Sequence, residues 1–248
     1  MPSIYIITGT SRGIGCAVAS RLLETGNRVF GVSRSPSPLA GERGFRAVQG
    51  SVTDPSWTGP LFEEVRGALA DDDADADMLC LLNNAAVLEP MGAIEHCQAQ
   101  AIRQHIEVNL TAPIVLTAQF MAYFADLQLR RKVVHMTSGA AHRAIPDMSL
   151  YCTSKAGISM FGACVGSEQE GSEHAYEVAA ISPGMVETDM QRDMRARSVE
   201  EFRPSEQFRA ARDSGAVQDT ATVARKICAI LEARTQMGGT VRVADWPD

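Results

Sequence analysis

Three residues in the middle of the chain have the types and the spacing that reduction of a carbonyl group requires. Tyr151 and Lys155 are four positions apart, so in a helix their side chains lie on the same face. A neighbouring ammonium favours the phenolate and lowers the pKa of a tyrosine, which can then exchange a proton with an alcohol oxygen. Ser138 follows an apolar run at residues 133–137 and can hydrogen-bond the same oxygen. Without a source of hydride, the Tyr–Lys pair alone would also suit an ordinary helix that carries a surface lysine.

A glycine-rich turn near the N-terminus is the expected site of a hydride-carrying cofactor. Residues 4–7 are an apolar run that suits a strand buried on both faces, and an amphipathic helical pattern follows the turn. Gly9 permits a tight turn, Gly13 lets the backbone approach a pyrophosphate, and Gly15 lets the helix pack closely on the strand. The strand–turn–helix context predicts dinucleotide binding, whereas glycines alone occur in many turns. The expected cofactor contacts in this turn are Gly9, Ser11, Arg12, Gly13, Ile14 and Gly15.

The end of the second predicted strand, residues 28–32, indicates which dinucleotide is bound. An NAD-binding protein usually has an acidic residue here, but this chain has Ser33, Arg34 and Ser35. A carboxylate would repel a 2′-phosphate, whereas the guanidinium of Arg34 can bind it with charge-assisted hydrogen bonds. Arg12 can approach the same phosphate from the glycine turn. Both arginines could instead be solvated loop residues, but the absence of an acid favours NADP(H).

Apolar segments that alternate with helical patterns predict an α/β fold, namely a doubly wound parallel sheet of about seven strands with helices on both faces. Besides the two strands above, the predicted strands are residues 45–49, 78–82, 133–137, 176–181 and 239–243. No linker or change of composition divides the chain, so residues 1–248 are expected to form one domain. The acidic residues 71–77 are expected to be a solvated loop. The motifs fall at the carboxyl ends of the strands, where such sheets bind ligands.

A long helical region, residues 99–124, contains both Asn109 and Pro113. Proline has no N–H group and cannot bond the carbonyl four residues before it, which belongs to Asn109. A kink there would free this carbonyl to hold a water molecule, although a proline can also be tolerated with no further role. Farther along, Met185, Met190 and Met194 could form an adaptable apolar lid or could equally be ordinary helical core.

The composition limits the classes of partner. The net charge of −7 argues against a nucleic-acid or anionic-membrane partner, and no apolar run approaches the length of a membrane-spanning helix. An apolar strand begins almost at Met1, which leaves no room for a signal peptide. The six cysteines show no paired spacing and are expected to be reduced thiols, so a cytoplasmic location is predicted. The five histidines are scattered, and no metal site is expected.

Taken together, these motifs resemble the short-chain dehydrogenase/reductase family over nearly the full length of the chain, which implies a single Rossmann-type domain. The matching positions are Thr8, Gly9, Gly13, Ile14, Gly15, Asn83, Asn84, Ala85, Asn109, Ser138, Tyr151, Lys155, Pro183, Gly184, Val186 and Thr188. The resemblance implies that Tyr151 is the acid/base, that Lys155 lowers its pKa and binds the nicotinamide ribose, and that Ser138 orients the substrate. It also implies that Asn109 holds a relay water and that residues 183–188 contact the nicotinamide.

Two positions depart from the family pattern. The family usually has an aspartate at the end of the third strand, which bonds the adenine; here Ser51 and Val52 follow that strand, and Asp54 comes three residues late. The family sequence Asn-Asn-Ala-Gly ends here in Ala86. The expected cofactor contacts outside the glycine turn are Ser33, Arg34, Ser35, Ser51, Val52, Asn83, Ala85, Asn109, Tyr151, Lys155, Pro183, Gly184, Val186 and Thr188.

Within the family, the chain looks most similar to the sepiapterin reductase and benzil reductase group. This resemblance implies an NADPH-dependent reduction of a small, largely apolar ketone or α-dicarbonyl, with substrate contacts at Ser138, Tyr151, Met185 and Asp245. It also implies a homodimer or homotetramer, for which Ile158, Met160, Phe161 and Val165 could supply the interface or could simply be core. Alternative hypotheses are an NADP-dependent alcohol dehydrogenase and a non-catalytic NADP-sensing protein.

Overall fold

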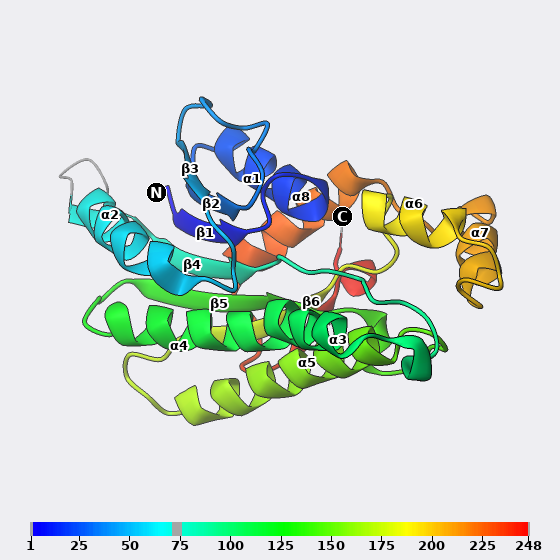
Figure 1. Cartoon of the computed structure of the whole chain (residues 1–248). Coiled ribbons are helices and arrows are strands. Elements are labelled where there is room, and N and C mark those ends of the chain that lie inside the picture. Colours follow the sequence, from blue (N-terminus) through cyan, green and yellow to red (C-terminus); the bar gives the residue numbers. More distant parts are fainter. Residues whose placement is uncertain (1, 71–75, 248) are drawn as a thin grey trace.

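A seven-stranded parallel sheet forms the centre of the molecule, with the strand order β3-β2-β1-β4-β5-β6-β7 (Figure 1). The computed structural model describes residues 2–70 and 76–247, so most of the predicted acidic loop, residues 71–75, lies outside the described residues. The strands are β1 (Ile4–Thr8), β2 (Arg28–Ser33), β3 (Phe45–Gln49), β4 (Met78–Asn83), β5 (Arg130–Met136), β6 (Glu177–Ser182) and β7 (Thr240–Arg242). The chain runs outward from β1 to β3 and then crosses to β4 on the other side of β1. This reversal confirms the predicted doubly wound topology and places a ligand crevice at the carboxyl ends of β1 and β4.

Helices cover both faces of the sheet. They are α1 (Gly13–Glu24), α2 (Thr58–Ala70), α3 (Ala99–Ile106), α4 (Ala112–Tyr123), α5 (Ser149–Gln169), α6 (Asp189–Ala196), α7 (Ser205–Asp213) and α8 (Thr220–Glu232). Successive side chains of a strand point to opposite faces, and on β1 Tyr5 and Ile7 pack with α1 and α8. Ile4 and Ile6 pack on the other face with α2 and α4. Because both faces are covered, every residue of β1 is buried, as its continuous apolar run predicts. In the described part of the chain, no helix combines the length and the hydropathy needed to cross a membrane.

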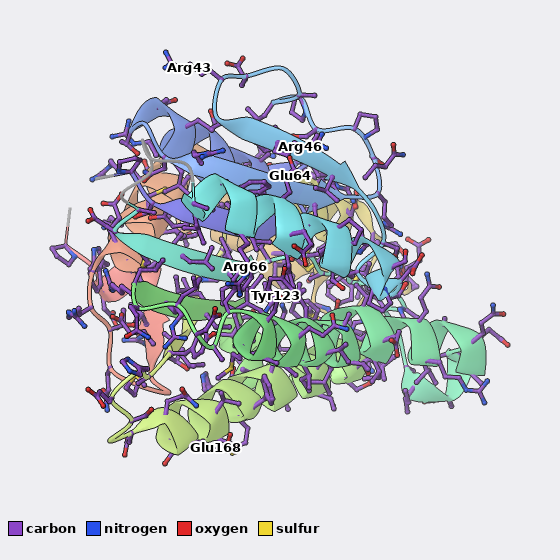
Figure 2. The ribbon with its side chains drawn as sticks, turned by 90° about the vertical axis from the view of Figure 1, so that its left-hand side faces the viewer. Arg43, Arg46, Glu64, Arg66, Tyr123 and Glu168 are labelled. Atoms are coloured by element: carbon purple, nitrogen blue, oxygen red, sulfur yellow. The ribbon has the colours of Figure 1, made fainter. Side chains whose placement is uncertain are left out.

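Arginine side chains connect α2 to its neighbours on the face of the sheet that α2 and α4 cover (Figure 2). Arg66 on α2 donates hydrogen bonds to Asp126, just beyond α4, and its guanidinium lies 5.0 Å from the ring centre of Tyr123. Nearer the sheet edge, Arg46 of β3 lies 2.6 Å from the carboxylate of Glu64 on α2. These contacts hold α2 between the edge strand and α4.

The helical region predicted at residues 99–124 is interrupted where the proline occurs. A π-helical turn over Glu107–Thr111 separates α3 from α4, and the N–H of Ala112 donates to the carbonyl of Glu107, five residues back. Pro113 begins the next helix and has no N–H to give to the carbonyl of Asn109. Such single π-turns frequently occur at functional sites. Here the turn carries Asn109 beside the carboxyl end of β4, where its side chain bonds the chain that leaves this strand.

Candidate active site

The turn between β1 and α1 leaves the first N–H groups of the helix open to an anion. The N-cap residue, Arg12, makes no side-chain cap, and the first turn of α1 contains no acidic residue. Gly9 and Gly13 have positive φ values of 80° and 59°, which favour glycine. A Cβ atom at Gly13 would meet only the methyl carbon of Thr188, at 3.7 Å, whereas one at Gly15 would lie 2.3 Å from the carbonyl oxygen of Gly9. The structure therefore fits a pyrophosphate at this helix N-terminus.

Two residues that the sequence analysis left without a role hold the glycine turn in place. The hydroxyl oxygen of Thr8 accepts hydrogen bonds from the N–H groups of Asn84 and Ala85, both at 3.0 Å. The side-chain amide of Asn84 donates to the carbonyl of Thr8 at 2.8 Å. Asn83 instead points into the core, where its amide donates to Thr117 at 3.1 Å. The repeated asparagine was the available signal, but only the structure shows which side chain supports the turn.

The turn after β2 lies beside the glycine turn. The hydroxyl of Ser33 donates to the carbonyl of Ser35 at 2.7 Å, and that of Ser37 donates to the carbonyl of Thr10 at 3.0 Å. Arg34 is exposed in this turn. Arg12, which was expected to approach the same phosphate, lies with one guanidinium nitrogen 3.4 Å from a carboxylate oxygen of Asp189 in α6.

The segment after β3 takes a different form from the family pattern. Ser51 bonds the hydroxyl of Thr53 at 2.8 Å, and its carbonyl accepts from the indole N–H of Trp57. Asp54 accepts from the N–H of Ser56 at 3.1 Å and so caps the short helical turn that follows. Its carboxylate therefore has a structural partner in the turn itself.

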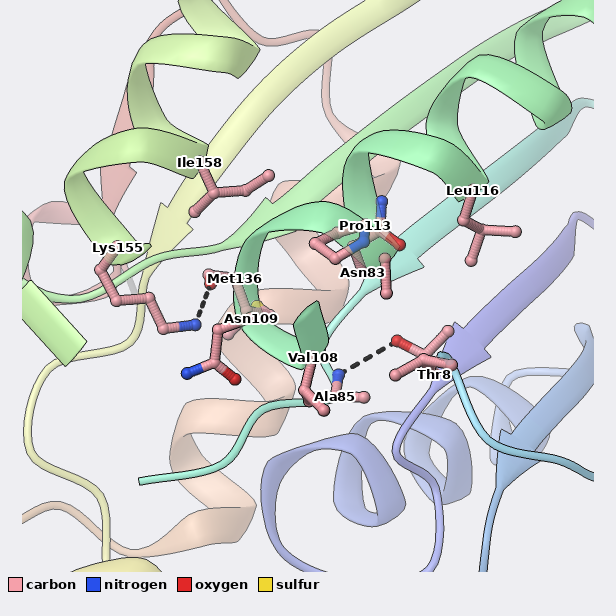
Figure 3. Close-up of a pocket in the computed structure, with 12 residues that line it drawn as sticks. Thr8, Asn83, Ala85, Val108, Asn109, Pro113, Leu116, Met136, Lys155 and Ile158 are labelled. Carbon is pink, nitrogen blue, oxygen red and sulfur yellow. Dashed lines mark hydrogen bonds between the residues drawn. The ribbon is translucent and has the colours of Figure 1, made fainter. Parts of the chain in front are cut away.

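A small cavity at the carboxyl ends of the central strands brings several predicted residues together (Figure 3). Its lining comes from the ends of β1, β4 and β5, the segments after β3 and β4, the π-turn, α4 and α5. The lining residues named by the sequence analysis are Thr8, Val52, Asn83, Ala85, Asn109, Pro113, Lys155 and Ile158. In Figure 3, Lys155 and Asn109 lie on the same side of this cavity, with Thr8 opposite.

Ser138, Tyr151 and Lys155 are assembled by β5 and the first two turns of α5. Ser138 lies just past β5 in extended conformation, where its hydroxyl accepts from the N–H of Ala140 at 3.2 Å and also acts to lower the pKa of Tyr151. Lys155 is buried, with Nζ 5.6 Å from the centre of the Tyr151 ring and 2.8 Å from the carbonyl oxygen of Met136. The predicted set is thus brought together at the carboxyl edge of the sheet.

The expected lowering of the Tyr151 pKa is not found in this structure. Burial raises the pKa of Tyr151 to about 12, and the hydrogen bond from Ser138 opposes this rise only in part. Burial also lowers the pKa of Lys155 to about 8. The pKa of Tyr151 rises because the amine of Lys155 is directed to the Met136 carbonyl. The loss of solvent around the phenol therefore has a larger effect on this pKa than any attraction between ammonium and phenolate.

The side-chain amide of Asn109 is fixed to the chain that leaves β4. Its oxygen accepts from the N–H of Val87 at 2.8 Å, and its nitrogen donates to the carbonyl of Val87 at 2.7 Å. The nitrogen also lies 3.0 Å from Nε2 of His105, a fully buried residue that the sequence analysis passed over as one of several scattered histidines.

A separate apolar cluster packs against Tyr151. Its buried members are Leu88, Met148, Met194, Phe202 and Phe208. Met185 and Met190 pack against it with part of their surface exposed, as does Tyr151. Met194 is therefore core, while the other two methionines border the site. The predicted segment at residues 183–188 leads from β6 to this cluster: Pro183 and Val186 are buried, Gly184 has a φ of 80°, and Thr188 is the N-cap of α6.

Two ion pairs join the α6–α7 segment to the loops around Tyr151. Arg197 pairs with Glu89, and Arg203 pairs with Asp147, which accepts from the Arg203 backbone N–H at 2.9 Å and from its Nε at 3.0 Å. Asp147 is nearly buried and has a φ of 63°, a conformation that aspartate tolerates better than most residues. The guanidinium of Arg203 holds the pKa of the Asp147 carboxyl below its usual range.

Asp245, a predicted substrate contact, pairs with Arg242 at 2.7 Å, and both side chains are exposed.

The apolar residues of α5 were expected to form either a subunit interface or part of the core. Ile158 and Val165 are buried and Phe161 packs against the core, so these three residues belong to the core. Met160 is 66% exposed.

Comparisons with known proteins agree with this architecture. The family model for short chain dehydrogenases matches residues 3–198. Benzil reductase ((S)-benzoin forming) from Bacillus subtilis (strain 168) is 32% identical over 235 residues, which cover 95% of this chain and 96% of that protein. Sepiapterin reductase from Meriones unguiculatus is 28% identical over 253 residues, which cover 96% of this chain and 94% of that protein. The crystal structure of the KRED1-Pglu enzyme has a TM-score of 0.83 and 26% identity, and covers 96% of this chain and 100% of that one.

The residues matched by the family model include the glycine turn, Asn109, Ser138, Tyr151 and Lys155. The family consists of oxidoreductases that use NAD(P)(H), and the open N-terminus of α1 fits a dinucleotide. The chain therefore belongs to the short-chain dehydrogenase/reductase family and lies near its benzil and sepiapterin reductases.

Proposed function

We propose that the protein is an NADPH-dependent carbonyl reductase that acts on a small apolar ketone or α-dicarbonyl, such as benzil or sepiapterin. The observation that carries this proposal is the environment of Tyr151. Its phenol, with a pKa of about 12, keeps its proton at neutral pH and borders an apolar cluster rich in methionine. A phenol that retains its proton is suited to donating it to a carbonyl oxygen, which favours reduction over alcohol oxidation.

The chain's own residues would divide the remaining tasks. Bound NADPH supplies the hydride that the carbonyl carbon accepts. Ser138 would hydrogen-bond the carbonyl oxygen, and Tyr151 would protonate it as the alcohol forms. Lys155, still largely charged at neutral pH with a pKa near 8, would stabilise the negative charge that develops on the Tyr151 oxygen. The backbone carbonyl of Asn109, to which Pro113 has no N–H to give, would hold a water at the edge of the cavity that Asn109 shares with Lys155.

The cofactor would lie along the carboxyl edge of the sheet. The pyrophosphate would lie on the N-terminus of α1, with Ser11, Gly13 and Ile14 around it, and the 2′-phosphate on the Ser33–Arg34–Ser35 turn. An exposed arginine and two hydroxyl side chains, with no carboxylate among them, support NADPH rather than NADH. The further contacts proposed are Ser51, Val52, Asn83, Ala85, Pro183, Gly184, Val186 and Thr188.

The apolar cluster supports an apolar substrate. Methionine is flexible and polarisable and packs well against flat aromatic groups, and Met185 borders Tyr151 through this cluster. The relative from Bacillus subtilis carries the name benzil reductase and aligns over nearly the whole chain. Asp245 remains a proposed substrate contact; it would have to exchange its present partner Arg242.

Turnover with benzil or sepiapterin tests the proposal. The purified protein should oxidise NADPH in the presence of either compound, and Tyr151→Phe should lower kcat by about 10²–10⁴-fold, the usual contribution of a positioned proton donor. Tyr123→Phe, at the far end of α4, should retain full turnover with an unchanged fold. Equal turnover by Tyr151→Phe, or no turnover by the unmodified protein with a panel of ketones, would exclude this function.

We further propose a single-domain cytoplasmic homodimer or homotetramer that contacts itself through α4 and α5. Val115 on α4 and Met160 on α5 are apolar side chains that are 39% and 66% exposed on these two helices. Sedimentation velocity would measure the mass of the assembly, and Met160→Glu should shift it toward monomer. A purely monomeric unmodified protein would contradict this assembly.

A further inference from the structure

We propose that His105 is a positioning residue that fixes the side-chain amide of Asn109 and connects it to the helix that carries Tyr151; the inference rests on the reductase function proposed above. His105 is fully buried in the last turn of α3, and Asn109 follows four residues later, in the π-turn. None of the motifs of the chain includes it.

The hydrogen-bond partners of His105 decide which ring nitrogen carries the proton. Nδ1 lies 2.8 Å from the carbonyl oxygen of Glu89, which can only accept, so Nδ1 is the donor. Nε2 of the neutral ring is then an acceptor. This matches the amide nitrogen of Asn109, 3.0 Å away, which can only donate.

The bond to His105 completes the partners of the Asn109 amide nitrogen. One amide hydrogen goes to the carbonyl of Val87 and the other to Nε2 of His105, while the amide oxygen accepts from the N–H of Val87. If the amide of Asn109 were flipped by 180°, its NH₂ group would face the N–H of Val87, and its oxygen would face the carbonyl oxygen of Val87 and the unprotonated Nε2 of His105. The hydrogen bond to His105 therefore favours the same orientation of the Asn109 side chain as the two hydrogen bonds to Val87.

The same ring nitrogen also faces α5. The hydroxyl oxygen of Ser154 lies 3.2 Å from Nε2 and 3.0 Å from the backbone carbonyl oxygen of Tyr151, so its single proton can be given to either of these two acceptors. The imidazole is 6.4 Å from the Tyr151 ring, measured between ring centres, in an edge-to-face arrangement. One buried ring thus touches the loop after β4, the π-turn and the first turn of α5.

The ring is kept neutral by its surroundings. Burial lowers the pKa of His105 and the charge of Lys155 lowers it further, although the carbonyls of Glu89 and Leu150 act in the opposite direction. A neutral ring is what the arrangement needs, because an imidazolium would direct an N–H at the NH₂ group of Asn109.

Three substitutions separate the two hydrogen bonds. His105→Gln keeps an acceptor at about the reach of Nε2, His105→Asn keeps only a donor at about the reach of Nδ1, and His105→Phe removes both. If His105 acts through Asn109, the Asn and Phe variants should lower kcat for the ketone by roughly ten- to a hundredfold with KM for NADPH nearly unchanged, whereas the Gln variant should retain most of kcat. Full activity of the Asn variant, or equal losses for Gln and Asn, would overturn the inference.

A double-mutant cycle distinguishes positioning from simple structural support. In an Asn109→Ala background, His105→Asn should cause no further loss of kcat, because the side-chain amide through which His105 holds the π-turn is already gone. An additional loss as large as in the unmodified protein would contradict a role through Asn109.

Nitrogen-15 NMR tests the same contact without any turnover, so it remains informative even if the protein reduces none of the ketones. At neutral pH, Nδ1 of His105 should be protonated and Nε2 should not, and the side-chain amide signal of Asn109 should move in the Asn variant but little in the Gln variant. The opposite tautomer, or an unmoved Asn109 signal, would overturn the positioning role, whereas a lack of turnover alone would count only against the reductase function.

Discussion

Nζ of Lys155 donates a hydrogen bond to the carbonyl oxygen of Met136, 2.8 Å away, and so ties the helix that carries Tyr151 to the end of β5. The amine is almost completely buried, and this burial sets its pKa near 8. The neighbouring phenol is shifted in the opposite direction, to about 12. In the range between these two values, Tyr151 still holds its proton after Lys155 has lost its charge.

The pH dependence of reduction should therefore follow Lys155. Its pKa is lowered from the ordinary value, so the ammonium is present below about pH 8 and is lost as the pH rises through that value. Ketone reduction should decline above about pH 8 while Tyr151 remains protonated, because the charge that stabilises the developing phenolate has gone. A kcat profile with NADPH measures this. Lys155→Met should be slow and should lack the decline; a profile that stays flat far above pH 8 would contradict the assignment.

The choice of cofactor should depend on Arg34. Arg34→Asp should raise KM for NADPH by roughly tenfold or more while leaving KM for NADH unchanged or lower, because a carboxylate repels the 2′-phosphate and favours a free ribose hydroxyl. The matched control is Arg43→Asp, which makes the same change of charge at another exposed arginine of the connection between β2 and β3. Equal effects of the two substitutions on KM for NADPH would show that only net charge matters.

Gly15 should not accept a side chain. A Cβ atom there would lie 2.3 Å from the Gly9 carbonyl and 2.4 Å from the Asn84 amide, so Gly15→Ala must displace the glycine turn. We expect loss of NADPH binding together with a lower melting temperature. Gly67→Ala in α2 is the control, since nothing lies within 4 Å of its added Cβ; it should stabilise the protein by about 0.5–1 kcal/mol. Retained NADPH affinity in Gly15→Ala would argue against this turn as the cofactor site.

Lys132 should contribute to stability rather than to turnover. Its fully buried amine donates to the carbonyls of Ile230, Leu231 and Ala233 at the end of α8, at 2.9, 3.1 and 2.7 Å. Lys132→Met keeps the length of the side chain but leaves these acceptors without their donor, so the free energy of unfolding should fall by about 3 kcal/mol. Denaturant titration with a kcat measurement on the folded variant would check this, and a large loss of kcat with unchanged stability would contradict it.

The fold was predictable because its strands are continuous apolar runs that only a sheet covered on both faces can bury. The predicted set of Ser138, Tyr151 and Lys155 assembles because two of its members share one helix face and the third lies at a strand end. The direction of the Tyr151 pKa shift was predicted wrongly, because sequence spacing says nothing about burial or about the Met136 carbonyl that draws the amine.

Other residues could not be found from local patterns at all. Thr8 meets Asn84 across 76 positions of sequence, and His105 meets Glu89 and Ser154 only after three elements have packed. Such contacts depend on tertiary packing: Thr8 belongs to the motif of the glycine turn, but the motif does not show its partner Asn84, and His105 belongs to no motif.

The carboxylates of the two arginine pairs that hold the α6–α7 segment differ in their access to solvent, so the two pairs should respond differently to ionic strength. The Glu89 side chain is 59% exposed, whereas that of Asp147 is 5% exposed. Dissolved salt screens an open pair far more than a sheltered one. Added sodium chloride should thus weaken the Arg197–Glu89 pair first, while Asp147 still holds Arg203 through its side chain and its backbone N–H.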